Sequence, residues 1–289
     1  MKPAPFEYVR PASVGDAIAA LAADEDAKPI AGGQSLMPML NMRLAQPTTL
    51  VDLNTLPELS YVRREGGQLV VGGMTRQRLL EQDPAAREAL PFLHDVIGHV
   101  GHVAIRNRGT VGGSIAHADP AAELPLVAVA LDAELVAQGP GGRRTIAAAD
   151  FFRMFLTTAL EPGELLVEVR FPTATGGWSA GFEELSRRHG DFAIVSVLAL
   201  VDVAGDGRVS AARIAVGGAN PVPLRVRGAE ELLVGRPLDA AAIAAAGASA
   251  AAAVEPTWDV HGSAEYRREM TAVLVGRALG RIADGKRSR

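Results

Sequence analysis

The N-terminal part of the chain alternates short apolar runs with segments whose apolar residues recur at helical spacing. Val14 to Ala22 has this spacing, and the hydroxyl of Ser13 can cap the resulting helix. Lys28 to Ala31 predicts a strand that runs into Gly32-Gly33, and Leu36 to Leu44 again has helical spacing. The same reasoning predicts strands over Thr49 to Leu53 and Gln68 to Val71, helices over Ala85 to Val96 and Leu124 to Ala130, and a glycine-interrupted strand or loop over Thr110 to Ala116.

Turn-forming residues gather between Pro172 and Gly177, which predicts a linker between two domains, residues 1–175 and 176–289. Beyond it, Asp206-Gly207 is typical of a hairpin. Strands are expected over Ser179 to Leu185, Phe192 to Val203 and Arg208 to Val216, and helices over Val226 to Val234, Ala240 to Val254 and Ser263 to Ile282. The predicted fold class is α+β, with a mixed N-terminal domain followed by a small three-stranded antiparallel sheet with helices.

Composition removes several classes of function. Hydrophobic residues make up 48% of the 289 residues and the formal net charge is -4, so a sizeable core can form and nothing favours nucleic acid or an anionic membrane as partner. The absence of cysteine excludes a disulfide, a thiolate zinc site, a cysteine nucleophile and an iron–sulfur cluster on this chain. No secretory signal is visible, and the apolar stretch around Phe192 to Val203 is shorter than the ~20 residues that a bilayer span needs. We therefore expect a cytoplasmic protein without a transmembrane segment, whose basic tail, Lys286 to Arg289, is a solvated end.

The first of two glycine-rich segments, Pro29 to Leu36, leaves a predicted strand and enters a predicted helix. Glycine lets the main chain turn with positive φ and approach a ligand closely. The start of the helix adds unpaired N–H donors and a partial positive charge, and Ser35 can cap the helix or donate its hydroxyl to an anion. These features suit a pyrophosphate, and no lysine is required.

The second segment, Arg106 to Ala116, repeats the small residues and hydroxyls, and we expect free backbone donors there too. A carboxylate in the following stretch, Asp119 to Leu124, can accept hydrogen bonds from ribityl or ribose hydroxyls. Neither segment has the spacing G-x-G-x-x-G, and no Gly-Lys-Ser/Thr of a Walker A loop occurs. Taken alone, each Gly-Gly pair is also compatible with a simple turn, so the residues themselves indicate only an anion-binding domain.

Three strings, taken in order, carry a family resemblance: Ala31-Gly32-Gly33-Gln34-Ser35-Leu36, Thr110-Val111-Gly112-Gly113-Ser114 and Ala118-Asp119-Pro120. They resemble the FAD-binding medium subunit of the molybdenum hydroxylases, a group that includes the carbon monoxide dehydrogenase medium subunit and the flavin domain of xanthine dehydrogenase. The resemblance covers nearly the whole chain, because it continues through Phe151-Phe152, Pro162 to Leu166, Arg187 to Phe192, Glu265 to Arg268 and Arg277 to Leu279.

This resemblance implies a two-part FAD-binding domain of the PCMH (vanillyl-alcohol oxidase-like) type, followed by the C-terminal flavoprotein domain. Glu123 falls where xanthine dehydrogenase relatives have an aspartate that touches the cofactor, and Leu166 matches a position near the flavin. Phe192 follows a loop that lies close to the isoalloxazine in some relatives and could cover the ring. The implied cofactor-binding residues are Pro29, Ile30, Ala31, Gly32, Gly33, Gln34, Ser35, Leu36, Thr110, Val111, Gly112, Gly113, Ser114, Asp119, Glu123, Leu166 and Phe192, with no catalytic residue and no metal ligand.

The sequence also departs from relatives at two positions. Glu183 stands where the xanthine dehydrogenase branch has a cofactor-contacting lysine, which weakens the case for NAD as acceptor. Gln34 stands where the carbon monoxide oxidising enzymes have histidine, but substrate identity is set on another subunit.

By resemblance, this chain is the flavoprotein subunit of a three-part oxidoreductase. A large subunit would hold molybdopterin and oxidise an aldehyde, an N-heterocycle or carbon monoxide, and a small subunit would carry two [2Fe-2S] clusters. FAD on this chain would pass electrons to a quinone, a carrier protein, NAD or oxygen, in a dimer of heterotrimers. Two alternatives remain open: a stand-alone FAD oxidoreductase of the same fold group, and a nucleotide-binding assembly module without redox activity.

Other polar groups have simpler interpretations. His99 and His102 could share a helix face, although Gly98 and Gly101 argue against a rigid helix, so we expect loop or interface histidines rather than a metal site. Asp191 beside Arg187 and Arg188 fits either a salt-bridged turn or a position next to the flavin. Arg267-Arg268 is expected on a solvated helix face or at a partner subunit.

Overall fold

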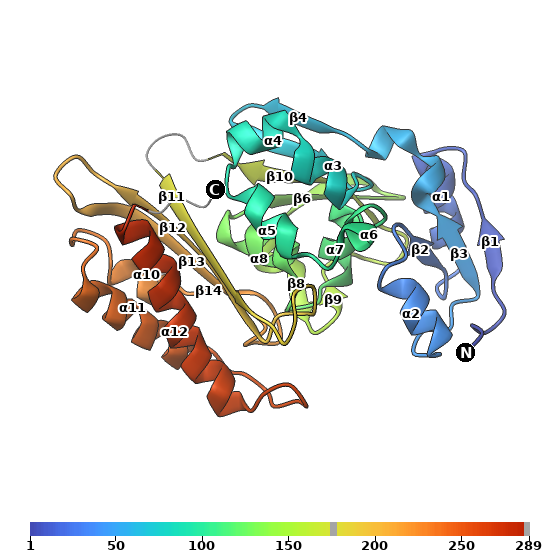
Figure 1. The fold of residues 1–289 in the computed structure, drawn as a ribbon. Coiled ribbons are helices and arrows are strands. Elements are labelled where there is room, and N and C mark those ends of the chain that lie inside the picture. Colours follow the sequence, from blue (N-terminus) through green and yellow to red (C-terminus); the bar gives the residue numbers. More distant parts are fainter. Residues whose placement is uncertain (174–177, 286–289) are drawn as a thin grey trace.

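The computed structural model of the chain describes residues 1–173 and 178–285, so the predicted linker boundary and the basic tail Lys286 to Arg289 lie outside the described residues. Its first sheet is small and parallel (Figure 1). In that sheet β1 (Glu7–Val9), β3 (Thr49–Asp52) and β2 (Lys28–Ile30) lie side by side in this order, connected by α1 (Val14–Ala22) and α2 (Leu36–Asn41). Because Ile30 pairs with Asp52, the carboxyl ends of β2 and β3 meet at one edge.

The second sheet is antiparallel and has five strands, which all belong to the N-terminal part of the chain. Its order is β4 (Val62–Glu65), β5 (Gln68–Gly72), β10 (Leu165–Pro172), β6 (Glu134–Gly139) and β7 (Gly142–Ala147). Short 3-10 turns, η1 (Leu53–Thr55) and η2 (Pro57–Leu59), join the first sheet to the second, and β8 (Phe152–Met154) pairs with β9 (Thr157–Thr158) outside both. The helices of this part are α3 (Gln77–Gln82), α4 (Pro84–Ala89), α5 (Leu93–His99), α6 (Val103–Arg106), α7 (Val111–His117), α8 (Glu123–Ala130) and α9 (Ala148–Phe151).

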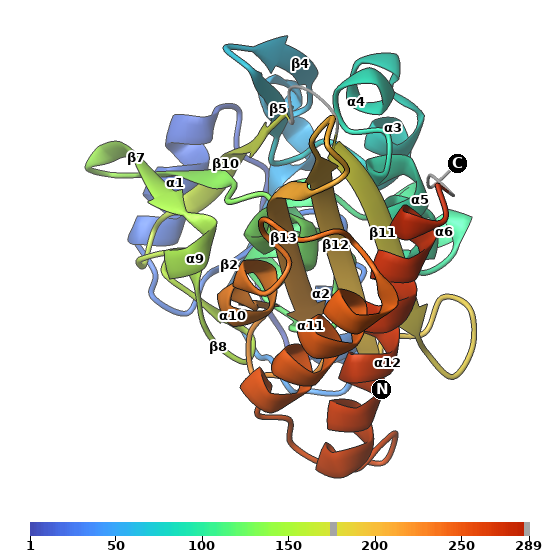
Figure 2. The same ribbon diagram turned by 90° about the vertical axis from the view of Figure 1, so that its left-hand side faces the viewer.

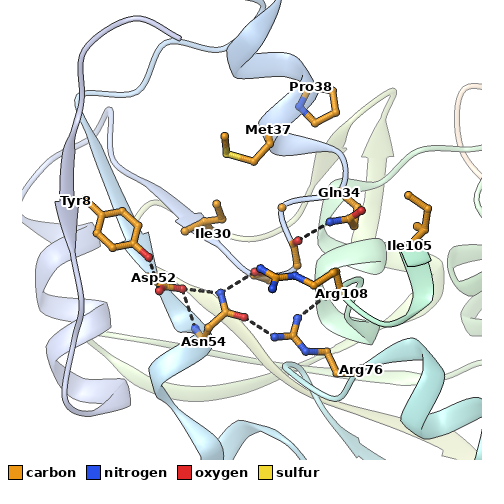
Figure 3. Close-up of a pocket in the computed structure, with 13 residues that line it drawn as sticks. Tyr8, Ile30, Gln34, Met37, Pro38, Asp52, Asn54, Arg76, Ile105 and Arg108 are labelled. Atoms are coloured by element: carbon orange, nitrogen blue, oxygen red, sulfur yellow. Dashed lines mark hydrogen bonds between the residues drawn. The ribbon is translucent and has the colours of Figure 1, made fainter. Parts of the chain in front are cut away.

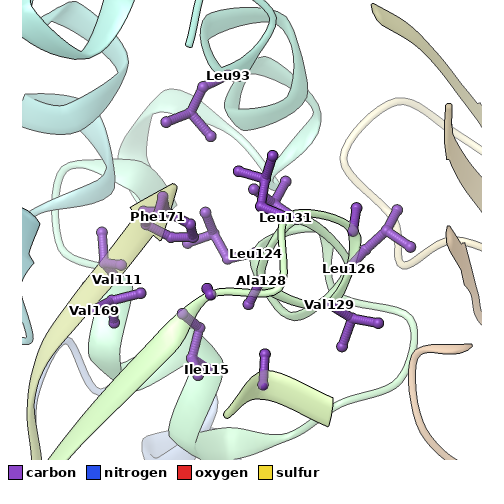
Figure 4. Close-up of a cluster of buried hydrophobic side chains, with 14 of the residues drawn as sticks. Leu93, Val111, Ile115, Leu124, Leu126, Ala128, Val129, Leu131, Val169 and Phe171 are labelled. Atoms are coloured by element: carbon purple, nitrogen blue, oxygen red, sulfur yellow. The ribbon is translucent and has the colours of Figure 1, made fainter. Parts of the chain in front are cut away.

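Helix α8 lies at the centre of the molecule. Every residue from Glu123 to Ala130 is buried, which explains why the helix is apolar all round instead of amphipathic. Its side chains pack against Phe171 of β10 and Ile115 of α7 in one continuous cluster (Figure 4). Leu198 of β12 belongs to the same cluster, so the C-terminal part closes the core of the N-terminal part.

The C-terminal sheet is antiparallel, with the order β11 (Trp178–Leu185), β12 (Val195–Val203), β13 (Val209–Gly217) and β14 (Leu224–Arg225). Helices α10 (Arg227–Glu231), α11 (Ala240–Ala253) and α12 (Ala264–Ala283) cover one face of this sheet (Figure 2). A Cβ on Gly181 would collide with the backbone of Ala278 in α12, whereas its neighbour Phe182 packs into the core shared with α5 and α8. Alternate residues of β11 therefore face the helices and the N-terminal part.

The α+β fold class is confirmed, and most of the predicted elements are present with ends shifted by a few residues. Ser13 caps α1 by accepting a hydrogen bond from the N–H of Asp16. Three predictions were wrong. Thr110 to Ala116 is mainly helix α7, the expected helix over Ala85 to Val96 is broken into α4 and α5 around Pro91, and β14 makes the C-terminal sheet four-stranded. Among the helices of residues 1–173 and 178–285, none has both the length and the apolar content needed to cross a membrane.

Candidate functional site

The two glycine segments, far apart in sequence, meet in space. A Cβ on Gly32 would lie 2.8 Å from the Cα of Gly109 and would also collide with the carbonyl group of Arg108. A Cβ on Gly113 would lie 3.4 Å from the Cβ of Ala31 in the same region. Only a residue without a side chain allows the backbones to approach this closely at Gly32.

The first segment presents unused backbone donors. Gly33 has a φ of 70°, which turns the chain between β2 and α2, and the side-chain amide of Gln34 donates to the carbonyl of Gly32 at 2.9 Å. The Ser35 hydroxyl makes no capping hydrogen bond, so it remains available to a ligand. Within the described ranges, the N–H groups of Gly33, Gln34 and Ser35 have no hydrogen-bond acceptor. Three consecutive free donors at the start of a helix form a concavity suited to an anion.

The second segment differs from its prediction. Val111 and Gly112 each donate their N–H at 2.9 Å to backbone carbonyls of residues 73–75. Gly113 donates to the hydroxyl of Thr110, the N-cap of α7, at 3.0 Å. The expectation of free backbone donors here was wrong, because the segment is a capped helix turn packed against another strand end. Its glycines, which are helical, serve close packing: a Cβ on Gly112 would lie 2.6 Å from the carbonyl oxygen of residue 73.

A cavity of about 600 Å³ opens beside this contact (Figure 3). Four of its lining residues are apolar: Ile30, Met37, Pro38 and Ile105. Figure 3 shows that the polar side chains of Tyr8, Asp52, Asn54 and Arg76 lie together and form a polar wall. The remaining lining residues are Tyr8, Ala31, Gly32, Gly33, Gln34, Asp52, Asn54, Arg76 and Arg108.

A chain of hydrogen bonds crosses the polar wall. The Tyr8 hydroxyl donates to one carboxylate oxygen of Asp52 at 2.5 Å, and the Asn54 amide donates to the other at 2.6 Å. Arg76 continues the chain by donating to the amide oxygen of Asn54 at 2.6 Å and to the carbonyl oxygen of Arg108. The network therefore joins the first sheet to the second glycine segment.

The surroundings of Tyr8, Asp52 and Arg76 shift the pKa values of these three side chains. The hydrogen bond to Asp52 raises the pKa of Tyr8 above its ordinary value. Burial raises the pKa of Asp52, but the hydrogen bonds from Tyr8 and Asn54 outweigh it, so the net pKa is lowered. Burial, followed by the neighbouring charge of Arg108, lowers the pKa of Arg76. The wall thus contains a fixed carboxylate and two guanidinium groups close to each other.

The cavity contains only part of the expected set, namely Ile30, Ala31, Gly32, Gly33 and Gln34. Sequence reasoning missed Tyr8, Asp52, Asn54 and Arg76 as site residues. A signal existed for Asp52 and Asn54, since Asp52 ends β3 and Asn54 follows it, and ligands bind at the carboxyl ends of parallel strands. Arg76 had no such signal.

The remaining expected residues do not line this cavity. Leu166 lies behind the second segment, where a Cβ on Gly73 would meet its carbonyl oxygen. Asp119 accepts a hydrogen bond from the N–H of Ala121 at 2.9 Å in a turn. Phe192 is 62% exposed. Pro29, Ser35, Leu36, Thr110, Val111, Gly112, Gly113, Ser114 and Glu123 also lie outside the cavity lining.

Glu123 lies at the start of α8 and is buried near Glu184 of β11. Burial, followed by the charge of Glu184, raises the pKa of Glu123 to about 8. Glu184, on the core-facing side of β11, lies 3.6 Å from a ring nitrogen of His99 through one oxygen, and its other oxygen is buried with no hydrogen-bond partner. Glu123 therefore retains a proton at neutral pH.

The loop after β11 rests on the N-terminal part. A Cβ on Gly190, which has a φ of 89°, would lie 2.7 Å from the His102 ring. Arg187 and Asp191 lie 3.6 Å apart, which confirms a salt-bridged turn. His99 ends α5 whereas His102 caps α6 with extended backbone, so the two do not share a helix face. Among the described residues no group of three or more His, Cys, Asp or Glu could hold a metal ion.

Glu183 and Arg267 both lie in the C-terminal part. Glu183 faces α12 and pairs with Arg281, on the side of β11 away from the N-terminal part. Arg267 is buried rather than solvated: it donates to the carbonyl of Ile194 at 2.5 Å and to the carboxylate of Asp259 at 2.7 Å. This arginine stabilises the C-terminal part from within.

Comparison with known proteins covers the whole chain. Residues 4–174 match the family model described as the FAD binding domain in molybdopterin dehydrogenase, and residues 180–282 match the CO dehydrogenase flavoprotein C-terminal domain. The chain is 42% identical to the 6-hydroxypseudooxynicotine dehydrogenase complex subunit alpha of Paenarthrobacter nicotinovorans, over 97% of this chain and 95% of the relative. It is 40% identical to the carbon monoxide dehydrogenase medium chain of Hydrogenophaga pseudoflava, over 96% and 97% respectively.

Two solved structures are similar to this chain over almost its whole length. A carbon monoxide dehydrogenase structure from Hydrogenophaga pseudoflava superposes with a TM-score of 0.96 at 40% identity and covers 100% of both chains. Quinoline 2-oxidoreductase from Pseudomonas putida 86 superposes with a TM-score of 0.94 at 40% identity, over 99% of both chains.

Proposed function

Because this chain belongs to the family of FAD-binding medium subunits of the molybdenum hydroxylases, we propose that it binds one FAD along the first glycine segment and relays electrons through it. It is thus an oxidoreductase subunit in which no residue need act as general acid or base. We further propose that residues 1–175 form the FAD-binding domain and residues 176–289 the C-terminal flavoprotein domain.

The observation that supports FAD most directly is the set of free N–H groups of Gly33, Gln34 and Ser35 beside the cavity. A diphosphate needs several converging donors, and the start of α2 supplies them without a lysine. The cavity of about 600 Å³ lies within the range of small-molecule and cofactor sites. The residues present therefore fit the cofactor.

The chain's own contribution to mechanism is binding and orientation. When bound, FAD joins one-electron supply to two-electron demand, and the protein sets its position and electrostatic surroundings. The hydrogen-bonded wall from Tyr8 to Arg76 fixes one side of the cavity, and the contact at Gly32 fixes the distance between the two glycine segments. Rigid elements hold such a site more accurately than mobile loops do.

For the complex, we propose a large molybdopterin subunit, a small subunit with two [2Fe-2S] clusters, and a cytoplasmic dimer of heterotrimers. Electrons would reach this chain from the small subunit and leave to an external acceptor. The proposal is supported by relatives named as parts of multi-subunit enzymes, a dehydrogenase complex subunit and a medium chain. The lack of cysteine agrees with clusters on another chain.

Purification of the chain together with its companions tests the proposal. We expect a yellow preparation with flavin absorbance that contains a cysteine-rich small chain and a much larger chain. A colourless preparation without any riboflavin derivative would contradict FAD binding and favour an assembly module. Full turnover of a small substrate by the isolated chain with NAD(P)H would instead support a stand-alone oxidoreductase.

A further inference from the structure

Two guanidinium groups, those of Arg76 and Arg108, line the same cavity close enough for each charge to act on the other. Arg76 is fully engaged, because it donates to the amide oxygen of Asn54 and to the backbone carbonyl of Arg108. Arg108, in contrast, forms no side-chain hydrogen bond or ion pair with any residue of the ranges 1–173 and 178–285. Figure 3 shows its side chain extending toward the wall that carries Asn54.

The local charge is unbalanced. Asp52 is the one carboxylate among the described lining residues, and it is occupied by the Tyr8 hydroxyl and the Asn54 amide. Two like charges near a single engaged carboxylate repel each other, unless a further anion lies between or beside them.

Free backbone N–H groups indicate where such an anion would bind. The free N–H groups of Gly33 and Gln34 border the same cavity, and Arg108 directly precedes Gly109, against which Gly32 packs. Backbone donors and a guanidinium thus border one small volume from two segments of the chain. A guanidinium matches phosphate oxygens geometrically, with two parallel N–H donors.

We propose that Arg108 is the side chain that pairs with the diphosphate of the bound dinucleotide. The proposal rests on FAD binding at this site and adds a charged ligand residue that lies outside the glycine strings.

The test uses the full-length chain stripped of flavin, with FAD, ADP and adenosine as probes in calorimetric titrations. Arg108→Gln should weaken binding of FAD and of ADP by about 10- to 100-fold, the value of a charge-assisted hydrogen bond, and should leave adenosine unchanged. Arg108→Lys should lose less, because it keeps the charge but not the paired donors. Arg236→Gln, at an exposed arginine of the C-terminal part, is the matched control and should bind every probe like the wild type.

The outcomes separate this inference from the proposed function. If the wild type binds FAD and ADP and Arg108→Gln binds them equally well, the role of Arg108 is refuted and FAD binding stands. An equal loss for adenosine would also refute it, since adenosine has no phosphate. If the wild type binds neither FAD nor ADP, the proposed function fails and this inference fails with it. Unchanged circular dichroism of Arg108→Gln shows that the exposed substitution has not unfolded the chain.

Discussion

Gly32 and Gly109 pack back to back, with a Cβ on Gly32 lying 2.8 Å from the Cα of Gly109. This contact joins the end of β2 to the segment that precedes α7. The two segments can lie this close only because Gly32 has no Cβ. A methyl group at this position would force one of the two backbones to move.

Gly32→Ala should therefore destabilise the protein by about 1–3 kcal/mol and reduce FAD retention, because overpacking shifts the backbone of the first segment. Chemical denaturation and the flavin content of the purified protein measure the two effects. Gly15→Ala in α1 is the control, since its Cβ would lie 3.6 Å from the nearest atom, an ordinary contact. That variant should be unchanged or slightly more stable. Equal behaviour of the two variants would show that the contact is not tight.

The cap of α7 gives a second prediction. Thr110 is buried and accepts a hydrogen bond from the N–H of Gly113 at 3.0 Å. Thr110→Val keeps the shape of the side chain but removes the acceptor, so it should cost about 0.5–2 kcal/mol in the free energy of unfolding. Thr110→Ser retains the hydroxyl and should cost less. A Thr110→Val variant as stable as the wild type in urea denaturation would rule out a contribution from this cap.

The buried Glu123 makes stability depend on pH. Its pKa of about 8 in the folded chain lies above the ordinary value of 4.5, so the folded state keeps a proton that the unfolded state releases. Stability should therefore be greatest below pH 4.5 as far as this group is concerned, and should fall as pH rises through 8, by about 5 kcal/mol in total.

Glu123→Gln replaces the protonated carboxyl by a neutral group of the same shape and should remove this dependence. We expect the variant to resemble the wild type in denaturation at pH 5 and to be more stable at pH 9. Glu58→Gln, at an exposed position, should follow the wild type at both pH values. A wild-type-like loss of stability in Glu123→Gln between the two pH values would mean that another group is responsible.

Arg106 and Glu81 form a buried ion pair that supports the second glycine segment. The two lie 3.0 Å apart with side-chain exposures of 9% and 6%, and Arg106 also donates to the carbonyl of Val100 at 3.1 Å. Arg106→Gln should cost about 3–5 kcal/mol because it leaves a buried carboxylate short of a partner. Arg78 pairs with the same carboxylate at 2.9 Å but is 34% exposed, so Arg78→Gln should cost much less. Thermal denaturation of both variants would decide, and equal losses would contradict the argument from burial.

Most local elements and the type of chemistry could be predicted from the sequence alone. Helical spacing with a capping Ser13, a strand running into Gly32-Gly33, and the lack of cysteine depend on neighbouring residues or on composition, so they can be read without a structure. The resemblance carried by the ordered glycine strings identified the family for the same reason, since it is a property of the chain as written.

The surroundings of the cavity, in contrast, depend on contacts between segments that are distant in sequence. Tyr8, Asp52 and Arg76 come from separate elements, and they meet because parallel pairing of β1, β3 and β2 and burial of the core bring distant segments together. Likewise, the segment after Thr110 is a helix whose first N–H groups, those of Val111 and Gly112, donate to backbone carbonyls of residues 73–75. Local sequence patterns reflect the backbone preference of each residue. The hydrogen bonds and charge interactions that line a cavity depend instead on contacts between residues far apart in the chain.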